Sequence, residues 1–270
     1  MRGLLLVLLA TAALAQRKPI FKSDGVSPGA GGAAELLESF CPGQVEVGEE
    51  IKCRETPDET AGFDCPPTAI MVTRGHFLSP KSDDILLALH ACEPHSAHFG
   101  STALLTREGG AWKYRWRKPG LITDRCHRMP LRSGRQILIC ELDEGFPGVT
   151  SMALYMVDVL HELDVPRDYY HDDAIFSAAE MIPCSGPADV VGQPITRAYI
   201  ERVEFYPRSS GDGENMTIFA QYGKTAMTAE MIAACSGPAT KPYRIDFLFD
   251  GRAYKVAARS GRALQVFGSH

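Results

Sequence analysis

The stretch that decides the fold is "STALLTREGGAWKYRWRK", residues 101–118. Its second half alternates strictly, with Trp112, Tyr114 and Trp116 at every other position and basic residues between them. A period of two is that of a β-strand, in which successive side chains point to opposite faces. The Glu-Gly-Gly between the halves is typical of a hairpin turn. The stretch therefore predicts an antiparallel hairpin with all three aromatic residues on one face.

The same design returns near the C-terminus in "YRIDFLFDGRAYKV", residues 243–256. We expect its alternating apolar residues to share one face and Asp250-Gly251 to form a two-residue turn. Other stretches are apolar without alternation, which indicates strands covered on both faces. They are "DILLALHAC" (84–92), "QILICEL" (136–142) and "MTIFAQYG" (216–223). Helices are expected only in "AELLESF" (34–40) or "MTAEMIAAC" (227–235).

These stretches align as about three units of four strands within a β domain spanning residues 66–258. In each unit the first strand is mixed, the second apolar on both faces, the third alternating and the fourth an outer strand. The predicted fold class is mainly β, built from antiparallel four-stranded meander units arranged like the blades of a propeller. A β-sandwich and an irregular stack of sheets remain as alternatives.

Two stretches resemble the FG-GAP and VCBS-type repeats of β-propellers. "TRGHFLSPKSDDILLAL" (73–89) resembles the start of such a repeat, and "SSGDGENMTIFAQYG" (209–223) resembles its acidic loop and buried strand. The resemblance implies a propeller with calcium-binding loops. The chain departs from it in having fewer units than the four to eight blades of a closed ring. The second loop also keeps only Asp212 and Glu214 as acidic ligands.

The N-terminal "MRGLLLVLLATAALAQ" predicts a signal peptide over residues 1–15, cleaved near Ala15/Gln16. The mature chain is then secreted or periplasmic, and no later stretch is long and apolar enough to predict a membrane span. Three further segments flank the β domain. We expect a flexible leader at 16–40, a cystine-braced segment at 41–65 and a C-terminal tail at 259–270.

The eight cysteines of an exported chain predict disulfides, and none lies in a Cys-x-x-Cys pair. Folding "CHRMPLRSGRQILIC" (126–140) about its centre places Cys126 opposite Cys140, although Cys92 is an alternative partner for either. The favoured second pair is Cys184 with Cys235. They lie in "AEMIPCSGPAD" (179–189) and "AEMIAACSGPAT" (229–240), interpreted as two strand ends closed by similar turns.

Two clusters of polar residues are candidate metal sites. His90, His95 and His98 surround Cys92 and could bind a transition metal, whereas His161, Asp164, His171 and Asp173 form an oxygen-rich group suited to calcium. Neither cluster has the spacing of a known metal motif. The chain also lacks the H-E-x-x-H, phosphate-loop and dinucleotide-binding patterns.

These patterns predict a broad class of function but no specific ligand. A composition of 45% hydrophobic residues with a net charge of −5 indicates a globular chain and argues against a nucleic-acid partner. The leading hypothesis is an exported, non-catalytic binding or interaction module without a cofactor, whose partner is a protein or a glycan. The alternatives are a secreted hydrolase with a scattered histidine and carboxylate site, and a calcium-stabilised surface protein.

Overall fold

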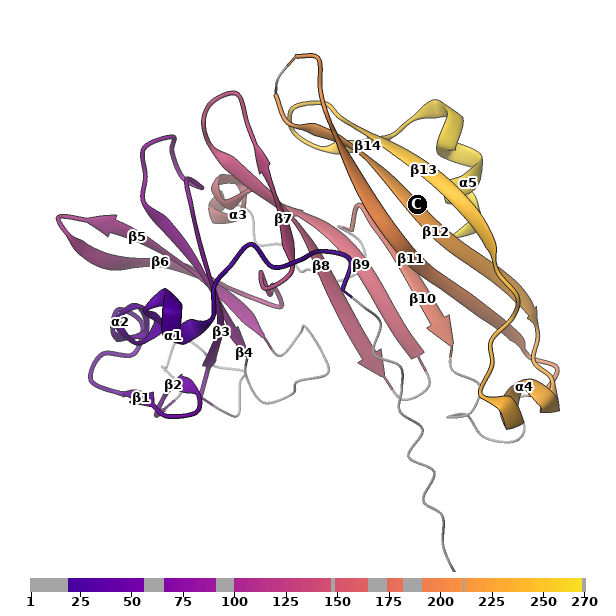
Figure 1. Cartoon of the computed structure of the whole chain (residues 1–270), viewed down its shortest axis with the longest axis horizontal. Helices are drawn as coiled ribbons and strands as arrows, with labels where there is room; N and C mark the ends of the chain where they lie inside the picture. Colours follow the sequence, from indigo (N-terminus) through magenta and orange to yellow (C-terminus); the bar gives the residue numbers. More distant parts are fainter. Residues whose placement is uncertain are drawn as a thin grey trace, which may run out of the picture.

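The computed structural model describes residues 19–55, 66–90, 100–146, 149–164, 174–181, 191–210 and 212–268. Within them the strands form two meandering sheets in which each strand pairs antiparallel with its neighbours in the chain (Figure 1). The predicted mainly β, antiparallel class is confirmed. The strands are grouped as six and eight rather than in fours, because hydrogen bonding continues without a break from β7 to β14.

The elements are as follows. The N-terminal sheet contains β1 (Val45–Val47), β2 (Ile51–Cys53), β3 (Thr68–Gly75), β4 (Asp84–His90), β5 (Ser101–Glu108) and β6 (Ala111–Pro119). The C-terminal sheet contains β7 (Cys126–Pro130), β8 (Gln136–Phe146), β9 (Val149–Val157), β10 (Phe176–Met181), β11 (Pro194–Pro207), β12 (Glu214–Ala226), β13 (Lys241–Phe249) and β14 (Tyr254–Val256). The helices are α1 (Pro28–Gly31), α2 (Ala33–Glu38), α3 (Val159–Asp164), α4 (Ala229–Ala234), η6 (Ala258–Ser260) and α5 (Gly261–Val266).

The apolar strand β4 is covered on both faces, as its sequence predicts. Leu87 packs with α2 in one cluster, and Leu86 packs on the other face in a cluster that also contains residues of β7 and β8. We call this second cluster the junction core, because it joins the two sheets. The stretch at 136–142 is likewise buried on both faces, with Leu138 in the junction core and Ile139 on the opposite side.

The predicted hairpin of β5 and β6 forms, but its aromatic residues do not share one face. The register shifts between Leu104, which pairs with Trp116, and Leu105, which pairs with Tyr114. The extra residue in β6, Arg115, is a bulge, and one extra residue reverses the alternation of a strand. Trp116 therefore packs against the junction core, whereas Trp112 and Tyr114 pack against the cluster that contains α2.

The stretch at 216–223 was expected to be covered on both faces by apolar layers, but only one of its two faces has an apolar cover. Strand β12 alternates, with Met216, Ile218 and Ala220 in the core. On its other face Thr217 donates to Asp246, and the guanidinium of Arg202 lies 3.5 Å from the ring centre of Phe219. Polar groups and the Arg202 side chain thus cover the face where the sequence suggested a second apolar layer.

The C-terminal sheet curls into a half-barrel (Figure 1). Its first strand, β7, approaches the last three strands across the concave face: Nε2 of His127 lies 2.6 Å from Oε2 of Glu214. Likewise, the Tyr254 hydroxyl lies 3.4 Å from Sδ of Met129. The end of α5 covers the same face, where Phe267 packs edge-on against Phe176. We call this apolar concave surface the half-barrel lining.

The segments at 16–40 and 259–270 are not a flexible leader and a tail where the structure describes them. Leu36 and Leu37 of α2 are buried against the N-terminal sheet, and Phe21 is part of the half-barrel lining. At the other end, Leu264 and Phe267 pack on that lining. Both segments contain few apolar residues among Gly, Ala and Ser, and those few are the ones that anchor them.

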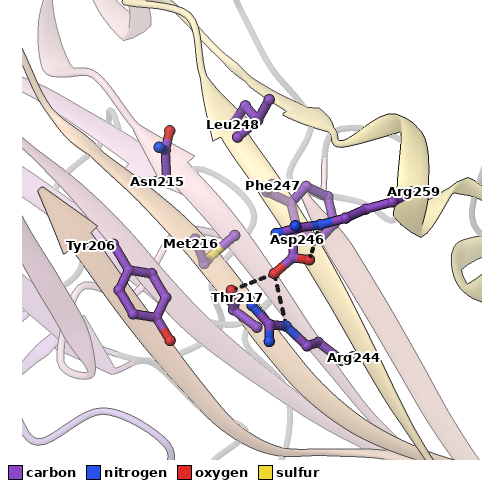
Figure 2. Close-up of a pocket in the computed structure, with 9 residues that line it drawn as sticks. All are labelled: Tyr206, Asn215, Met216, Thr217, Arg244, Asp246, Phe247, Leu248 and Arg259. Carbon is purple, nitrogen blue, oxygen red and sulfur yellow. Dashed lines mark hydrogen bonds and ion pairs between the residues drawn. The ribbon is translucent and has the colours of Figure 1, made fainter. Parts of the chain in front are cut away.

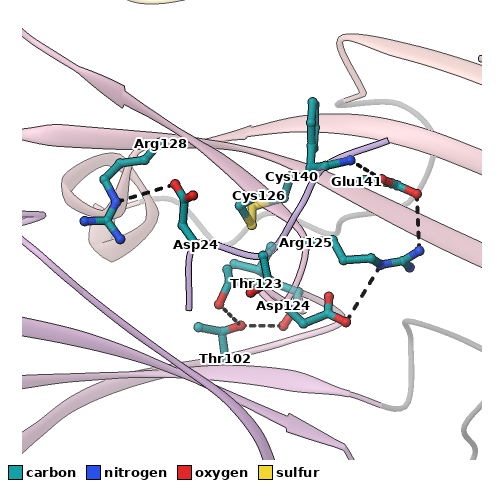
Figure 3. The surroundings of a disulfide bond; sticks show 12 residues. Asp24, Thr102, Thr123, Asp124, Arg125, Cys126, Arg128, Cys140 and Glu141 are labelled. Carbon is teal, nitrogen blue, oxygen red and sulfur yellow. Dashed lines mark hydrogen bonds and ion pairs between the residues drawn. A yellow bond between two sulfur atoms is a disulfide. The ribbon is translucent and has the colours of Figure 1, made fainter. Parts of the chain in front are cut away.

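The N-terminal segment is also held by Glu141 of β8, whose side chain is fully buried (Figure 3). Its carboxylate accepts hydrogen bonds from the backbone N–H groups of Ile20 and Phe21, at 2.8 and 3.2 Å. Nη1 of Arg125 lies 3.2 Å from its other oxygen. A buried carboxylate is costly without such partners. These hydrogen bonds fix the backbone of Ile20 and Phe21 to the half-barrel.

Glu141 predicts a distinctive pH dependence of stability. Burial raises the pKa of its carboxyl above the ordinary 4.5, although attraction to Arg125 lowers it in part. The native protein then holds this proton to a higher pH than the unfolded chain does. The contribution of Glu141 to the free energy of unfolding should therefore fall as the pH rises from the pKa of the unfolded chain through the higher pKa of the folded protein. Urea unfolding of the wild type and of Glu141→Gln between about pH 4 and 8 measures the difference. Parallel curves would contradict the prediction.

Two disulfides are described. Cys41 is joined to Cys53 within the predicted cystine-braced segment, and Cys126 is joined to Cys140 across β7 and β8 (Figure 3). The second is the bridge that the predicted hairpin requires. Cys235 is also disulfide-bonded, but its predicted partner Cys184 lies outside the described residues. In the described part of the chain no cysteine is free.

The two copies of A-E-M-I adopt different structures. The first ends β10, whereas the second forms α4, so the interpretation of both as strand ends is wrong for the second. Thr228 caps α4 by accepting a hydrogen bond from the N–H of Met231 at 3.2 Å, and threonine is a favourable N-cap. The two helices α2 and α4 lie where the sequence predicted helices.

Candidate ligand-binding site

A cavity of about 590 Å³ lies at one end of the half-barrel. Its walls come from the end of β9, from α3 with the residues that precede β10, and from the connection between β13 and β14. The lining is Met156, Asp158, His161, Ala174, Ile175, Gly251, Arg252, Ala253 and Tyr254. Residues far apart in the sequence therefore meet here only because the sheet curls.

Asp158 fixes one wall. Its carboxylate accepts a hydrogen bond from the N–H of Leu160 at 3.2 Å, which caps the start of α3. The same oxygen pairs with the guanidinium of Arg135. Arg135 in turn donates from Nε to the carbonyl of Phe77, in the loop between β3 and β4, at 3.1 Å. The charge of Asp158 is thus neutralised within the protein, and α3 is held at a fixed position beside the cavity.

The opposite wall is the connection between β13 and β14. Its sequence predicts a two-residue turn, but Phe249 pairs with Tyr254, so four residues connect the strands. Asp250 explains the difference: its carboxylate accepts the N–H groups of Arg252 and Ala253, both at 2.9 Å. Hydrogen bonding to Lys255 and to these amides keeps the pKa of Asp250 well below its usual range. Gly251, at φ 104°, supplies the left-handed backbone that the turn requires.

This turn places Arg252 in the cavity lining, where it has no ionic partner among the described residues. The side chain is exposed, and among the described residues no hydrogen bond or ion pair is formed by its guanidinium. Asp158, the one described carboxylate in the lining, is already paired with Arg135. Among the described lining residues, Arg252 therefore carries a charge that no described carboxylate neutralises.

The remaining wall is apolar. Met156, Ala174 and Ile175 line it together with the ring of Tyr254. Burial, with a smaller effect from Glu214, raises the pKa of Tyr254, so its hydroxyl stays neutral. Apolar walls with a few placed polar groups, and volumes of about 300–1,000 Å³, are typical of small-molecule sites. The combination suits a ligand with an apolar body and an anionic group.

The candidate residues from the sequence are dispersed where the structure describes them. His161 lies on α3 in the cavity lining, whereas His90 ends β4 in the other sheet. Asp164 is the last residue of α3, but its side chain, like all of His95, His98, His171 and Asp173, lies outside the described residues. Among the described side chains, no group of three or more His, Cys, Asp or Glu residues could hold a metal ion.

Sequence patterns did not single out Arg252, Met156 or Ile175 as site residues. Asp250-Gly251 was predicted to be a turn, but the prediction placed Arg252 in the following strand and not in the turn. The half-barrel curl that brings Met156 and Ile175 opposite this turn leaves no local mark in the sequence.

Within the described ranges, no helix is long and apolar enough to cross a membrane. Comparison of the chain with protein-family models, with curated proteins and with solved structures finds no match in any of the three. The resemblance to FG-GAP and VCBS-type repeats therefore stays a prediction from the sequence pattern, and the site has to be interpreted from its own geometry.

Proposed function

We propose that this chain is an exported binding module that holds a small amphipathic anion in the cavity between α3 and the β13–β14 turn. The observation that carries the proposal is the guanidinium of Arg252, which has no partner among the described residues and lines a cavity of about 590 Å³ together with an apolar wall. Arg252 would bind the anionic group, and Met156 and Ile175 would contact the apolar body. Each interaction alone is weak, and the shape of the cavity combines them.

Export is supported by the disulfides, which form and persist in oxidising compartments. All five cysteines in the described part of the chain are disulfide-bonded. The predicted signal peptide over residues 1–15 lies outside the described residues and stays a prediction. Together they favour a secreted or periplasmic protein.

Binding is favoured over hydrolysis by the composition of the cavity. His161 is the one described histidine in the lining, and the described lining contains no serine, threonine or cysteine that it could activate. The carboxylate of Asp158 is engaged by Arg135 and by the N–H of Leu160. A general base and a nucleophile within hydrogen-bond reach of each other are the minimum for covalent hydrolysis, and the described lining does not supply them.

The test is a fluorescence titration of the mature chain with 1-anilinonaphthalene-8-sulfonate, which combines apolar rings with a sulfonate. We expect saturable binding to the folded protein. Arg252→Glu should weaken it about tenfold, equivalent to about 1.4 kcal/mol. Ala253→Trp should weaken it as much without changing the charge, because the indole fills the cavity from the turn.

Lys241→Glu is the matched control. Lys241 is an exposed cation at the end of β13 away from the turn, and its replacement changes the net charge as much as Arg252→Glu does. It should leave the affinity within about twofold of the wild type. Equal weakening by Lys241→Glu and Arg252→Glu would show that overall charge, and not the cavity, governs binding. An Ala253→Trp variant that binds like the wild type would also refute the proposed site.

A further inference from the structure

A second hollow, of about 230 Å³, lies on the opposite face of the C-terminal sheet from the half-barrel lining (Figure 2). Arg244, Asp246 and Leu248 alternate along β13 with Ile245 and Phe247, which belong to that lining. The rest of the lining comes from Tyr206 of β11, from Asn215, Met216 and Thr217 of β12, from Phe247 of β13 and from Arg259 of η6. It is separate from the cavity that contains Arg252.

Asp246 is the anchor of this hollow. The side chain of Asp246 is only 9% exposed. Its carboxylate accepts hydrogen bonds from Oγ1 of Thr217 at 2.7 Å, Nε of Arg244 at 3.1 Å and Nε of Arg259 at 2.9 Å (Figure 2). Burial alone would raise the pKa of Asp246, but the hydrogen bonds from Thr217 and the two arginines outweigh it and lower the pKa. Asp246 is therefore ionised at neutral pH and fixes both guanidinium groups.

The two arginines use only part of their donor capacity on Asp246. Each donates from Nε, and among the described residues no partner is bonded to their terminal Nη groups. The side chains are 58% and 73% exposed, so these terminal groups reach solvent. Two guanidinium charges against one carboxylate leave a net positive charge. The neighbouring Glu204 is engaged by Nε of Arg202 at 3.0 Å and by the hydroxyl of Tyr206.

An apolar rim lies beside these donors. Tyr206 and Leu248 are 42% and 50% exposed, so a bound group can reach both side chains. Both belong to the lining of the hollow. Asn215, between them on β12, is fixed by accepting the N–H of Phe249 at 3.1 Å. The rim therefore presents an aromatic ring and an aliphatic side chain on a rigid strand surface.

From this arrangement we propose that the hollow binds an oxyanion (a carboxylate, phosphate or sulfate group) carried by an aromatic or similarly flat apolar group. The terminal groups of Arg244 and Arg259 form charge-assisted, bidentate hydrogen bonds to the oxyanion. The apolar part packs on Tyr206 and Leu248. Because Asp246 already holds both guanidinium groups, little side-chain freedom is lost on binding.

The first test observes the arginine Nε–Hε resonances of the full mature chain by NMR during titration with phenyl phosphate, benzoate or phenol. Phenyl phosphate and benzoate should shift the resonances of Arg244 and Arg259, with Kd values on the order of 1 mM. Phenol, which lacks the oxyanion, should not. A larger response to phenyl phosphate than to benzoate would assign the site to phosphate or sulfate esters, and the reverse would assign it to carboxylates. If neither anion shifts these two resonances, the proposal is wrong.

The second test uses variants. Arg244→Gln combined with Arg259→Gln should weaken phenyl phosphate binding at least tenfold, measured by calorimetry, whereas Arg262→Gln on the exposed side of α5 should not. Arg252→Glu should leave the Arg244 and Arg259 shifts unchanged, which separates this site from the cavity. Should the double variant fold poorly, the resonance shifts of the wild type still decide the matter. Unchanged affinity in a folded double variant would overturn the proposal.

Discussion

Replacing either Leu86 or Leu87 by alanine should cost about 2–5 kcal/mol of unfolding free energy, which is the usual range for fully buried leucines. Both side chains are fully buried, although neighbouring positions in a strand point to opposite faces. Leu86 lies in the junction core and Leu87 in the cluster that contains α2. Each substitution leaves a cavity in a different layer, so both should be severe. Urea unfolding at constant pH measures the loss.

Leu248→Ala is the matched control. It removes the same atoms from a strand, but at a position where the leucine is 50% exposed. It should alter stability by less than about 0.5 kcal/mol. If only one of the two β4 variants is destabilised, then one face of β4 is not covered and the two-layer packing of the N-terminal sheet is wrong.

Removing the Cys126–Cys140 bridge with the double variant Cys126→Ala/Cys140→Ala should cost about 3 kcal/mol. The two cysteines are 14 residues apart in the sequence. Cross-linking a loop of this size lowers the conformational entropy of the unfolded chain by the equivalent of about 3 kcal/mol. Both cysteines are also buried in the junction core, so their loss reduces packing between the sheets. Denaturant unfolding of the variant and the wild type, each under oxidising conditions, measures the difference.

Burial adds a second expectation for this bridge. Cys126 and Cys140 are 4% and 0% exposed, so a reducing agent should reach them only when the protein opens. Reduction of this pair in the native protein should therefore be slow and should accelerate with added urea. Fast reduction without urea, or a loss of less than about 1 kcal/mol in the double variant, would contradict the described junction.

The strands could be predicted from the sequence because period-two alternation and short apolar runs are local features. The packing of particular side chains could not. Nothing near Arg115 marks it as a bulge, yet that one residue moves Trp116 to the other face of β6. Phe219 made the β12 stretch appear apolar on both faces, but the partner of its ring is Arg202 rather than a second layer.

Context, and not composition, also separates the two A-E-M-I segments. The first lies against β9 and pairs with it residue by residue, so it extends as a strand. The second follows Thr228, which caps a helix, and its residues lie outside the ladder between β12 and β13. Similarly, the leader was predicted to be flexible because Gly and Ala dominate it. Phe21 and Leu37 are its anchors, and their partners lie far away in the sequence.

The candidate site was predictable only in one residue. His161 was singled out as a potential calcium or metal ligand, and it does line the cavity. The cavity owes its positive charge to Arg252 on the turn and its apolar wall to Met156 and Ile175. These residues come together because the eight-stranded sheet curls. Such a long-range arrangement is set by the register of every pair between β7 and β14, which no local pattern in the chain specifies.

The most direct test of the proposed function is to observe the cavity itself while it is occupied. Methyl NMR of the mature chain, titrated with 1-anilinonaphthalene-8-sulfonate, should show large saturable shifts for the methyl groups of Met156 and Ile175. The methyl of Ile85 in the N-terminal sheet should not move. The shifts should be lost in Ala253→Trp. Binding that leaves Met156 and Ile175 unshifted, or that moves Ile85 as much, would contradict the account of this cavity as the ligand site.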